Sequence, residues 1–295
     1  MPDRKRKQRP EVAIIGAGRL GSALAAALAR HGYPIRSFVS RRAQTARKAA
    51  ALVAEFLDAE PQALAAKDLR LLRPAELSLI TTPDDQVARV ASALSRLPLP
   101  PGSVRTALHT SGALSAEVLS PLRTRGWHTG SIHPLISISD KTSSLAGAFW
   151  SVEGDRTALR VGKSVVRDLG GSSFSIRSED KPLYHAAAVM TSGNVVALFD
   201  VALEMLMQCG LPRSKAHSIL LPLLASTARS LETSDPKQAL TGTFSRGDVE
   251  TVKRHLQALK GKKLSDALAL YRLLGQRSLR LSKKHPRITR ILKSV

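Results

Sequence analysis

The fold of this chain is decided by residues 11–21, which read EVAIIGAGRLG. Residues 11–15 form a short apolar run rich in β-branched side chains, a pattern that predicts a strand. A glycine-rich turn follows directly, and residues 22–31, SALAAALARH, predict a helix that stops at Gly32. Residues 34–40 predict a second strand, so the segment reads as one β-α-β unit. In that context a GxGxxG spacing indicates a dinucleotide-binding turn.

The three glycines of this turn, Gly16, Gly18 and Gly21, have separate roles in such a site. The first permits the sharp turn, the second lets a pyrophosphate approach the backbone, and the third lets the helix pack against the strand. Free N–H groups and the positive end of the helix dipole then favour bound phosphate. The alternative is a glycine-rich turn that holds no ligand. We expect a cofactor to contact the whole turn, namely Gly16, Ala17, Gly18, Arg19, Leu20 and Gly21.

The end of the second predicted strand indicates which dinucleotide fits. An acidic residue there accepts hydrogen bonds from the ribose 2′-hydroxyl of NAD. This chain has Ser40, Arg41 and Arg42 at that place and no acidic residue until Glu55. A carboxylate would repel a 2′-phosphate, whereas a hydroxyl and two guanidinium groups would bind it. The sequence therefore favours NADP(H), and the alternative is that both arginines are ordinary surface charges on a basic protein.

The alternation of strands and helices continues to about Arg177 and then stops. Further strands are predicted at residues 77–81, 103–110, 129–132, 149–153 and 173–176, with helices at 43–56, 86–97, 113–125 and 156–169. Beyond them the patterns are helical, at residues 181–209, 214–230, 248–259 and 264–281. We therefore predict an α/β fold, a doubly wound Rossmann domain followed by an all-helical C-terminal domain. The predicted boundaries are a basic N-terminal arm at 1–10, an NADP-binding domain at 11–177 and a helical domain at 178–295.

Polar residues follow three of the predicted strands. The turn Thr82-Pro83-Asp84 is expected to line the dinucleotide, because cofactors lie at the carboxyl ends of strands in such sheets. The alternative is a simple Pro-Asp turn that ends a strand. Ser111 and His133 are expected to open onto the same crevice. A histidine can exchange a proton near neutral pH, but a single histidine can equally serve as a structural hydrogen-bonding group.

The first helix of the C-terminal domain adds a second set of candidates. Lys181, His185 and Ser192 are spaced i, i+4 and i+11, which places them on one face of a continuous helix. That polar stripe faces either a substrate or solvent. The rest of the helix, residues 181–209, is apolar over most of its circumference, so we expect it to be buried in a homodimer.

Charge and composition narrow the partners of this 295-residue chain. The net charge is +22, and half of the excess lies in residues 1–10 and 276–295, which we interpret as solvated basic tails. Neither tail contains an aromatic residue, so nucleic acid is not an expected partner, with weak polyanion binding as the alternative. The single cysteine, Cys209, fits a reducing cytoplasm. No uninterrupted apolar run predicts a membrane span, and no cluster of residues has the spacing of a metal site.

Four motifs occur in order along the chain: HTSG at 109–112, SIHPL at 131–135, YHAAA at 184–188 and LTGTFSRGD at 240–248. This series resembles the bacterial family that joins a Rossmann-like domain to a DUF2520 domain. That family is similar to pyrroline-5-carboxylate reductase and to the 6-phosphogluconate dehydrogenase-like superfamily. The resemblance implies an N-terminal NADP-binding domain and a helical domain that dimerises. It points to Ser111, His133, His185, Ser192 and the loop 241–248 as site residues.

Two functions of different class follow from these observations. The first is an NADP(H)-dependent oxidoreductase that acts on a small imine, keto or hydroxy acid. In it His185 or His133 donates a proton and Ser111 and Lys181 complete the catalytic set. Ser192, Thr241 and Arg246 would bind the substrate, with the arginine pairing with a carboxylate. The second is a regulatory protein that binds NADP(H) without turnover.

Overall fold

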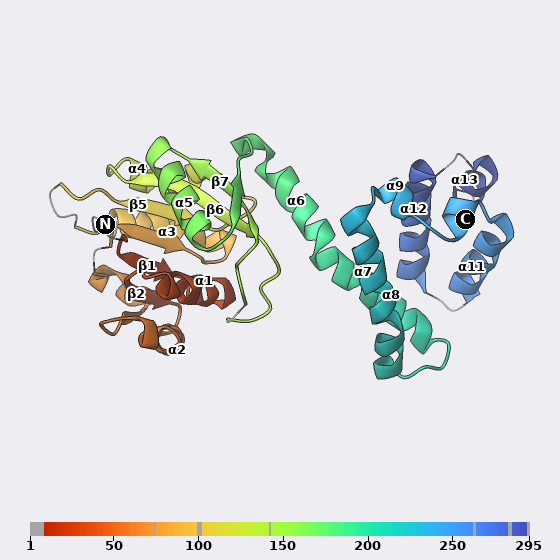
Figure 1. Ribbon diagram of the computed structural model, residues 1–295, viewed down its shortest axis with the longest axis horizontal. Helices are drawn as coiled ribbons and strands as arrows, with labels where there is room; N and C mark the ends of the chain where they lie inside the picture. Colours follow the sequence, from red (N-terminus) through yellow and green to blue (C-terminus); the bar gives the residue numbers. More distant parts are fainter. Residues whose placement is uncertain are drawn as a thin grey trace, which may run out of the picture. The chain divides into compact units, whose positions relative to one another are not determined.

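The computed structural model of the chain describes residues 9–73, 75–98, 102–141, 143–261, 264–282 and 285–293. The chain divides into two compact units that meet between Val189 and Met190. The first unit is the α/β part and the second is helical, as the sequence predicted (Figure 1). The predicted fold class, a doubly wound Rossmann domain followed by a helical region, is confirmed.

The first unit is built on one eight-stranded sheet with the order β3-β2-β1-β4-β5-β6-β7-β8. Neighbouring strands are parallel except for β6 and β7, which run antiparallel. The strands are β1 (Val12–Ile15), β2 (Ile35–Ser40), β3 (Gln62–Ala65), β4 (Leu77–Ile80), β5 (Thr106–His109), β6 (His128–Leu135), β7 (Phe149–Gly154) and β8 (Ser172–Phe174). Strand β3 was not predicted from the sequence, because its residues QALA include no β-branched or aromatic side chain.

Helices cover both faces of this sheet. Side chains of β1 alternate between the two faces, so Val12 and Ile14 enter one core while Ala13 and Ile15 enter the other. The first core also takes residues of α1 (Arg19–Arg30), α2 (Ala43–Ala51) and α5 (Arg156–Asp168). The second core takes residues of α3 (Asp84–Ser95), the 3₁₀ helix η3 (Ala116–Leu119) and α4 (Ser120–Arg123). Short 3₁₀ helices also occur at η1 (Ala54–Phe56), η2 (Ala66–Leu71) and η4 (Ser178–Asp180).

The order of the strands fixes where a ligand can bind. The chain winds outward from β1 to β2 and β3, then returns to the other side of β1 with β4. Crossovers therefore leave β1 and β4 in opposite directions, and their carboxyl ends open a crevice. The GxGxxG turn lies at the end of β1, in this crevice, as the sequence predicted.

The long helix predicted at residues 181–209 is divided in two. Helix α6 runs over Lys181–Thr191 and α7 over Gly193–Met207, with Ser192 between them in a non-helical conformation (φ −114°, ψ −83°). The prediction of one continuous helix was therefore wrong at this point. Because a glycine directly follows Ser192, the backbone there is less constrained than in the alanine-rich turns before it. The predicted stripe of Lys181, His185 and Ser192 is consequently not one face of a single helix.

One helical stretch of the described chain, Ser178–Met207, is long and apolar enough to cross a membrane by length and composition alone. An 18-residue window within it has a mean hydropathy of 1.6, and 6% of that window is buried within the chain. The sequence predicts no membrane span and favours a dimerising helix for these residues. Core helices of soluble proteins have the same length and composition.

The second unit consists of packed helices. They are α7, α8 (Arg213–Thr233), α9 (Pro236–Ala239), α10 (Thr243–Arg246), α11 (Val249–Gly261), α12 (Ser265–Leu281) and α13 (Pro286–Lys293). The last three form a core around Val252, Leu256, Leu279, Ile288 and Leu292, against which Phe244 and Tyr271 pack. The prediction of a solvated basic tail at residues 276–295 was therefore wrong for its described residues, because Leu279, Ile288 and Leu292 are buried in this core.

Candidate functional site

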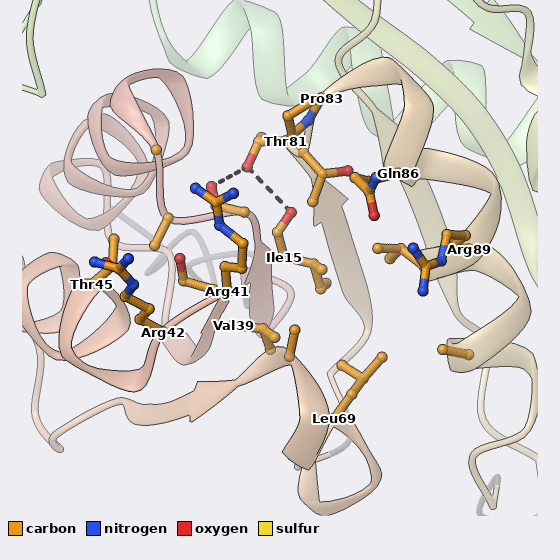
Figure 2. Close-up of a pocket in the computed structure, with 18 of the residues that line it drawn as sticks. Ile15, Val39, Arg41, Arg42, Thr45, Leu69, Thr81, Pro83, Gln86 and Arg89 are labelled. Carbon is orange, nitrogen blue, oxygen red and sulfur yellow. Dashed lines mark hydrogen bonds between the residues drawn. The ribbon is translucent and has the colours of Figure 1, made fainter.

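A cavity of about 860 Å³ lies at the carboxyl ends of β1, β2 and β4 (Figure 2). Eight of the residues predicted to bind a cofactor line it: Gly16, Ala17, Gly18, Ser40, Arg41, Arg42, Thr82 and Pro83. The other four, Arg19, Leu20, Gly21 and Asp84, are not among its lining residues. The cavity is thus formed by the same strand ends that the sequence analysis singled out.

The turn after β1 holds its shape through contacts with β4. Gly16 has φ +118°, a conformation that favours glycine, and Thr81 Oγ1 donates a hydrogen bond of 2.6 Å to the Gly16 carbonyl oxygen. A Cβ atom on Gly21 would overlap that same carbonyl oxygen. A Cβ atom on Gly18 would meet no atom within 4 Å, so the backbone there faces open space. No side chain caps the first turn of α1, which leaves its N–H groups available to an anion.

The walls of the cavity carry mostly positive charge. Arg41 and Arg42 project from the end of β2 beside Thr45, and Arg89 projects from α3 on the opposite wall (Figure 2). Asp85 is the one acidic residue among those that line the cavity. No carboxylate lies at the end of β2, where an NAD site holds one. The residues present fit a dinucleotide that carries an additional phosphate.

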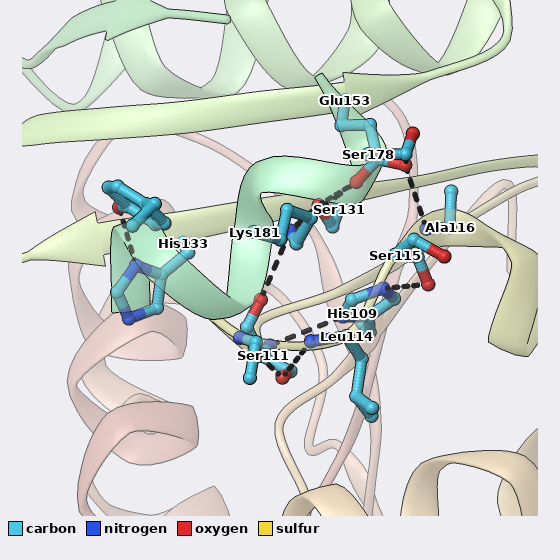
Figure 3. A network of polar contacts seen from close by, with 12 residues as sticks. His109, Ser111, Leu114, Ser115, Ala116, Ser131, His133, Glu153, Ser178 and Lys181 are labelled. Atoms are coloured by element: carbon cyan, nitrogen blue, oxygen red, sulfur yellow. Dashed lines mark hydrogen bonds and ion pairs between the residues drawn. The ribbon is translucent and has the colours of Figure 1, made fainter. Parts of the chain in front are cut away.

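A second group of polar residues lies at the end of β5, within β6, near the end of β7 and on the first turns of α6 (Figure 3). We call it the polar cluster; it comprises His109, Ser111, Ser131, His133, Glu153, Lys181, Tyr184 and His185. All of these residues belong to the first unit. The structure therefore brings together the four predicted catalytic residues Ser111, His133, Lys181 and His185.

Lys181 is fully buried, at 0% exposure. Its ammonium nitrogen lies 2.7 Å from Ser131 Oγ, 3.4 Å from the Ser111 carbonyl oxygen and 3.4 Å from Glu153 Oε2. Burial lowers the pKa of Lys181, while the Glu153 carboxylate opposes that change and favours the charged form. The lysine is thus held as one half of a buried ion pair.

The hydroxyl of Ser111 has its hydrogen-bonding capacity in use. It donates to Asp84 Oδ2 at 2.8 Å and accepts from the backbone N–H groups of Ala113 (3.2 Å) and Leu114 (3.0 Å). These bonds fix the loop that follows β5. They also explain why Asp84 does not line the cavity, because its carboxylate points to Ser111 instead.

His133 and His185 contact each other edge to face, with ring centroids 5.4 Å apart. His133 Nδ1 forms a 2.7 Å hydrogen bond with the Tyr184 hydroxyl. Burial, together with the nearby His185 and the Lys181 cation, lowers the pKa of His133 to about 4, so its ring is neutral at pH 7. By contrast, His185 Nδ1 is buried and has no hydrogen-bond partner among the described residues. It faces Gly112, where a Cβ atom would overlap it.

Glu153 was not selected from the sequence, whereas His109, Ser131 and Tyr184 were named only within motifs. His109 is fully buried, and burial together with the Lys181 cation lowers its pKa to about 4. Its Nδ1 accepts a hydrogen bond from the Ser111 N–H, which leaves Nε2 to donate to the Ser115 carbonyl oxygen. The sequence did carry a signal for Ser131 and His133, because they are two residues apart on a strand and so point to the same face of the sheet.

Three predicted substrate-binding residues lie in the second unit. Ser192 is the break between α6 and α7, Thr241 precedes α10, and Arg246 ends α10. All three are exposed. Their role in binding remains a prediction.

Two family models match the chain. A Rossmann-like domain covers residues 2–134, and the domain of unknown function DUF2520 covers residues 148–278. The chain joins a Rossmann-like domain to a DUF2520 domain. The resemblance stated from the four motifs is therefore confirmed.

The polar cluster draws on both matched domains. Its residues on β5 and β6, including Ser111 and His133, lie in the Rossmann-like match, whereas Glu153, Lys181 and His185 lie in the DUF2520 match. The DUF2520 match thus begins within the strands of the first unit, well before the helical part.

Solved structures share this fold over nearly the whole chain. A Bacteroides fragilis protein provisionally named an NADP oxidoreductase is 25% identical, with a TM-score of 0.74 over 95% of this chain and 99% of that one. A reductive aminase from Aspergillus terreus, in complex with NADPH4, cyclohexanone and allyl amine, is 16% identical, with a TM-score of 0.63 over 96% and 99%. A pyrroline-5-carboxylate reductase from Coxiella burnetii is 16% identical, with a TM-score of 0.55 over 92% and 98%. No curated protein matches the chain.

Proposed function

We propose that this chain is an NADP(H)-dependent oxidoreductase that acts on a small imine, keto or hydroxy acid. The observation that carries the proposal is the cavity beyond β1, β2 and β4, which is lined by the glycine-rich turn after β1 and by two arginines at the place where NAD sites hold a carboxylate. The similarity to structures named as an NADP oxidoreductase, a reductive aminase and a pyrroline-5-carboxylate reductase supports it.

The cofactor, when bound, would supply or accept a hydride at its nicotinamide ring. The N–H groups of the turn around Gly18 would bind its pyrophosphate, as they face open space at the start of α1. Ser40, Arg41 and Arg42 would bind the 2′-phosphate, because guanidinium groups pair with phosphate through two parallel hydrogen bonds. Thr82 and Pro83 would contact the cofactor from the end of β4.

Reduction of a carbonyl or imine also requires a proton, and we assign its donor to His185 in preference to His133. The Nδ1 atom of His133 is hydrogen-bonded to the Tyr184 hydroxyl. Because the pKa of His133 is about 4, its ring is neutral at pH 7 and is not the imidazolium that a general acid requires. His185 has a buried ring nitrogen with no partner among the described residues. Ser111 and Lys181 would act on the geometry of the cluster, since both have their hydrogen bonds in use.

The substrate would be a small molecule, and we propose that Ser192, Thr241 and Arg246 contribute to binding it. The Arg246 guanidinium is exposed and would pair with a substrate carboxylate. This pairing is the reason why we propose a substrate that carries a carboxylate.

We also propose that the chain forms a homodimer through its helical domain, at residues 178–295, while residues 11–177 bind the cofactor. Large apolar side chains stand exposed on α6, α7 and α8, among them Leu183, Met190, Val196 and Leu223. A surface of that kind marks an association site. Light scattering at tens of micromolar should show a dimer, and a monomer would contradict the proposal.

The single cysteine supports a cytoplasmic location. The basic arm at residues 1–10 lies almost wholly outside the described residues.

The competing function is a regulatory protein that binds NADP(H) without turnover. Incubation of the protein with NADPH deuterated at the transferable position and a set of cyclic imines and keto acids, the keto acids being the oxidised forms of hydroxy acids, separates the two. An oxidoreductase transfers deuterium to one class of compound in proportion to the NADPH oxidised. A protein that binds NADPH tightly but leaves it unoxidised with every class is a sensor.

A further inference from the structure

Glu153, which the sequence did not suggest, has polar contacts with four residues of the site and its surroundings. Its Oε1 atom accepts hydrogen bonds from the Ala116 N–H (3.0 Å) and the Ser178 hydroxyl (2.7 Å). Its Oε2 atom lies 3.4 Å from the ammonium of Lys181 and 3.5 Å from the hydroxyl of Ser131. This one carboxylate on β7 therefore binds the start of η3, the turn η4, the first residue of α6 and the middle of β6 (Figure 3).

Lys181 is held on every side by this arrangement. An ammonium group has three N–H donors, and three oxygen atoms surround this one, from Ser131, Ser111 and Glu153. The side chain is 0% exposed, and that of Glu153 is 12% exposed. A saturated and buried ammonium can fix the start of a helix, but it has no free donor with which to touch a substrate.

The spacing of contacts shows how α6 lies on the sheet. Ser131 and His133 are two residues apart on β6, so their side chains point to the same face of the sheet about 6.6 Å apart. Lys181 and Tyr184 are three residues apart on α6, close to one helical turn. Lys181 contacts Ser131, and Tyr184 contacts His133. The first turn of α6 thus lies along β6 with two matched contacts.

We infer that Glu153 is a positioning residue for the proposed reaction: through Lys181 it holds the first turn of α6 on β6, and so sets where Tyr184 and His185 stand beside His133. The inference rests on the proposed function for its link to catalysis. It assigns Lys181 a positioning role, in place of the catalytic role expected from the sequence.

Removal of the Glu153 charge has a consequence that can be measured at His133. A buried Lys181 cation without its counter-charge is strongly unfavourable, so the ammonium either loses its proton or moves out. Both changes remove a cation that lowers the pKa of His133. If α6 is also less firmly held, water reaches the His133 ring and the effect of burial on its pKa is reduced. The titratable groups that face His133 are Tyr184, His185 and Lys181, all on α6. The pKa of His133 should therefore rise towards its ordinary value.

The test is nuclear magnetic resonance titration of the full chain with labelled histidine, comparing the wild type with Glu153→Gln. We expect the His133 titration to move upward by at least one pH unit, while NADPH affinity stays within twofold. Glu117→Gln is the matched control, because Glu117 is an exposed carboxylate that pairs with Arg123 away from the cluster. It should leave the His133 titration unchanged.

A double variant, Glu153→Gln with Lys181→Met, removes both charges and so avoids an unpaired buried cation if the single variant fails to fold. It should show the same upward shift, because the anchor of α6 is lost either way. A merely structural Glu153 would lower the stability of these variants and leave the His133 titration where it is in the wild type, and that result would overturn the inference. The titration needs no turnover, so a wild-type protein that binds no NADPH would refute the proposed function and leave this test intact.

Discussion

The hydroxyl of Tyr184 lies 2.7 Å from Nδ1 of His133, and this hydrogen bond joins helix α6 to strand β6. The tyrosine ring also packs edge to face on His133 and on Phe174. The bond therefore links the helix that carries His185 to the strand end that carries His133.

Replacing Tyr184 by Phe removes that bond and keeps the ring packing. A half-buried His133 nitrogen loses its partner, which costs about 1–3 kcal/mol of unfolding free energy. Denaturant unfolding measures the loss. The matched control is Tyr33→Phe, since Tyr33 donates a similar bond of 2.6 Å to Asp168 far from the cluster. Both variants should lose stability, but turnover should fall only in Tyr184→Phe; equal turnover in the two would show that the Tyr184 bond has no part in the reaction.

The two low histidine pKa values predict how stability changes with pH. The pKa of His109 is about 4 in the folded chain because of burial and the Lys181 cation, against an unfolded value of about 6.5. A histidine whose folded pKa is depressed binds its proton more readily in the unfolded state. Its contribution to stability is therefore present above pH 6.5 and lost as the pH falls from 6.5 to 4. The shift corresponds to about 3 kcal/mol at most for His109 alone.

Denaturant unfolding at pH 7, 5.5 and 4 measures this loss, and His133 adds to it in the same direction. His109→Gln should flatten the curve, because glutamine does not titrate. A wild-type stability that stays constant from pH 7 to pH 4 would contradict the burial of both neutral rings.

The proton donor can be identified by parallel substitutions. His185→Ala should cut turnover by roughly 10²–10⁴-fold and leave NADPH affinity largely intact, since a general acid acts in the transition state. His133→Ala should have a smaller effect. The reverse order would exchange the two roles, and normal turnover in both variants would exclude either histidine as the donor.

The sequence was sufficient for seven of the eight strands that the structure describes and for the cofactor turn, because their signals are local. The β-branched run before Gly16, the alanine-rich helix after it and the paired arginines after β2 each lie within a few residues of the feature they predict. Strand β3 and the break at Ser192 were missed for the same reason, because neither carries a strong local pattern.

The polar cluster could be predicted only in part. Ser111, His133, Lys181 and His185 were selected from strand ends and helix spacing, and the structure brings them together. Glu153 could not be found in that way, because its partners lie between 22 and 37 residues away along the chain. The role of Lys181 was also beyond the sequence, since its burial depends on three elements that meet only in the fold.

The affinity for NADPH relative to NADH tests the central claim most directly. Titration followed by nicotinamide fluorescence should show NADPH binding at least tenfold tighter, a difference of about 1.4 kcal/mol. Replacing Arg41 and Arg42 by Ala should abolish most of this preference. Arg47→Ala is the matched control, because Arg47 is exposed on α2, the helix that directly follows the two arginines, and does not line the cavity. Equal binding of both cofactors by the unmodified protein, or binding of neither, would contradict the assignment of this cavity to NADP(H).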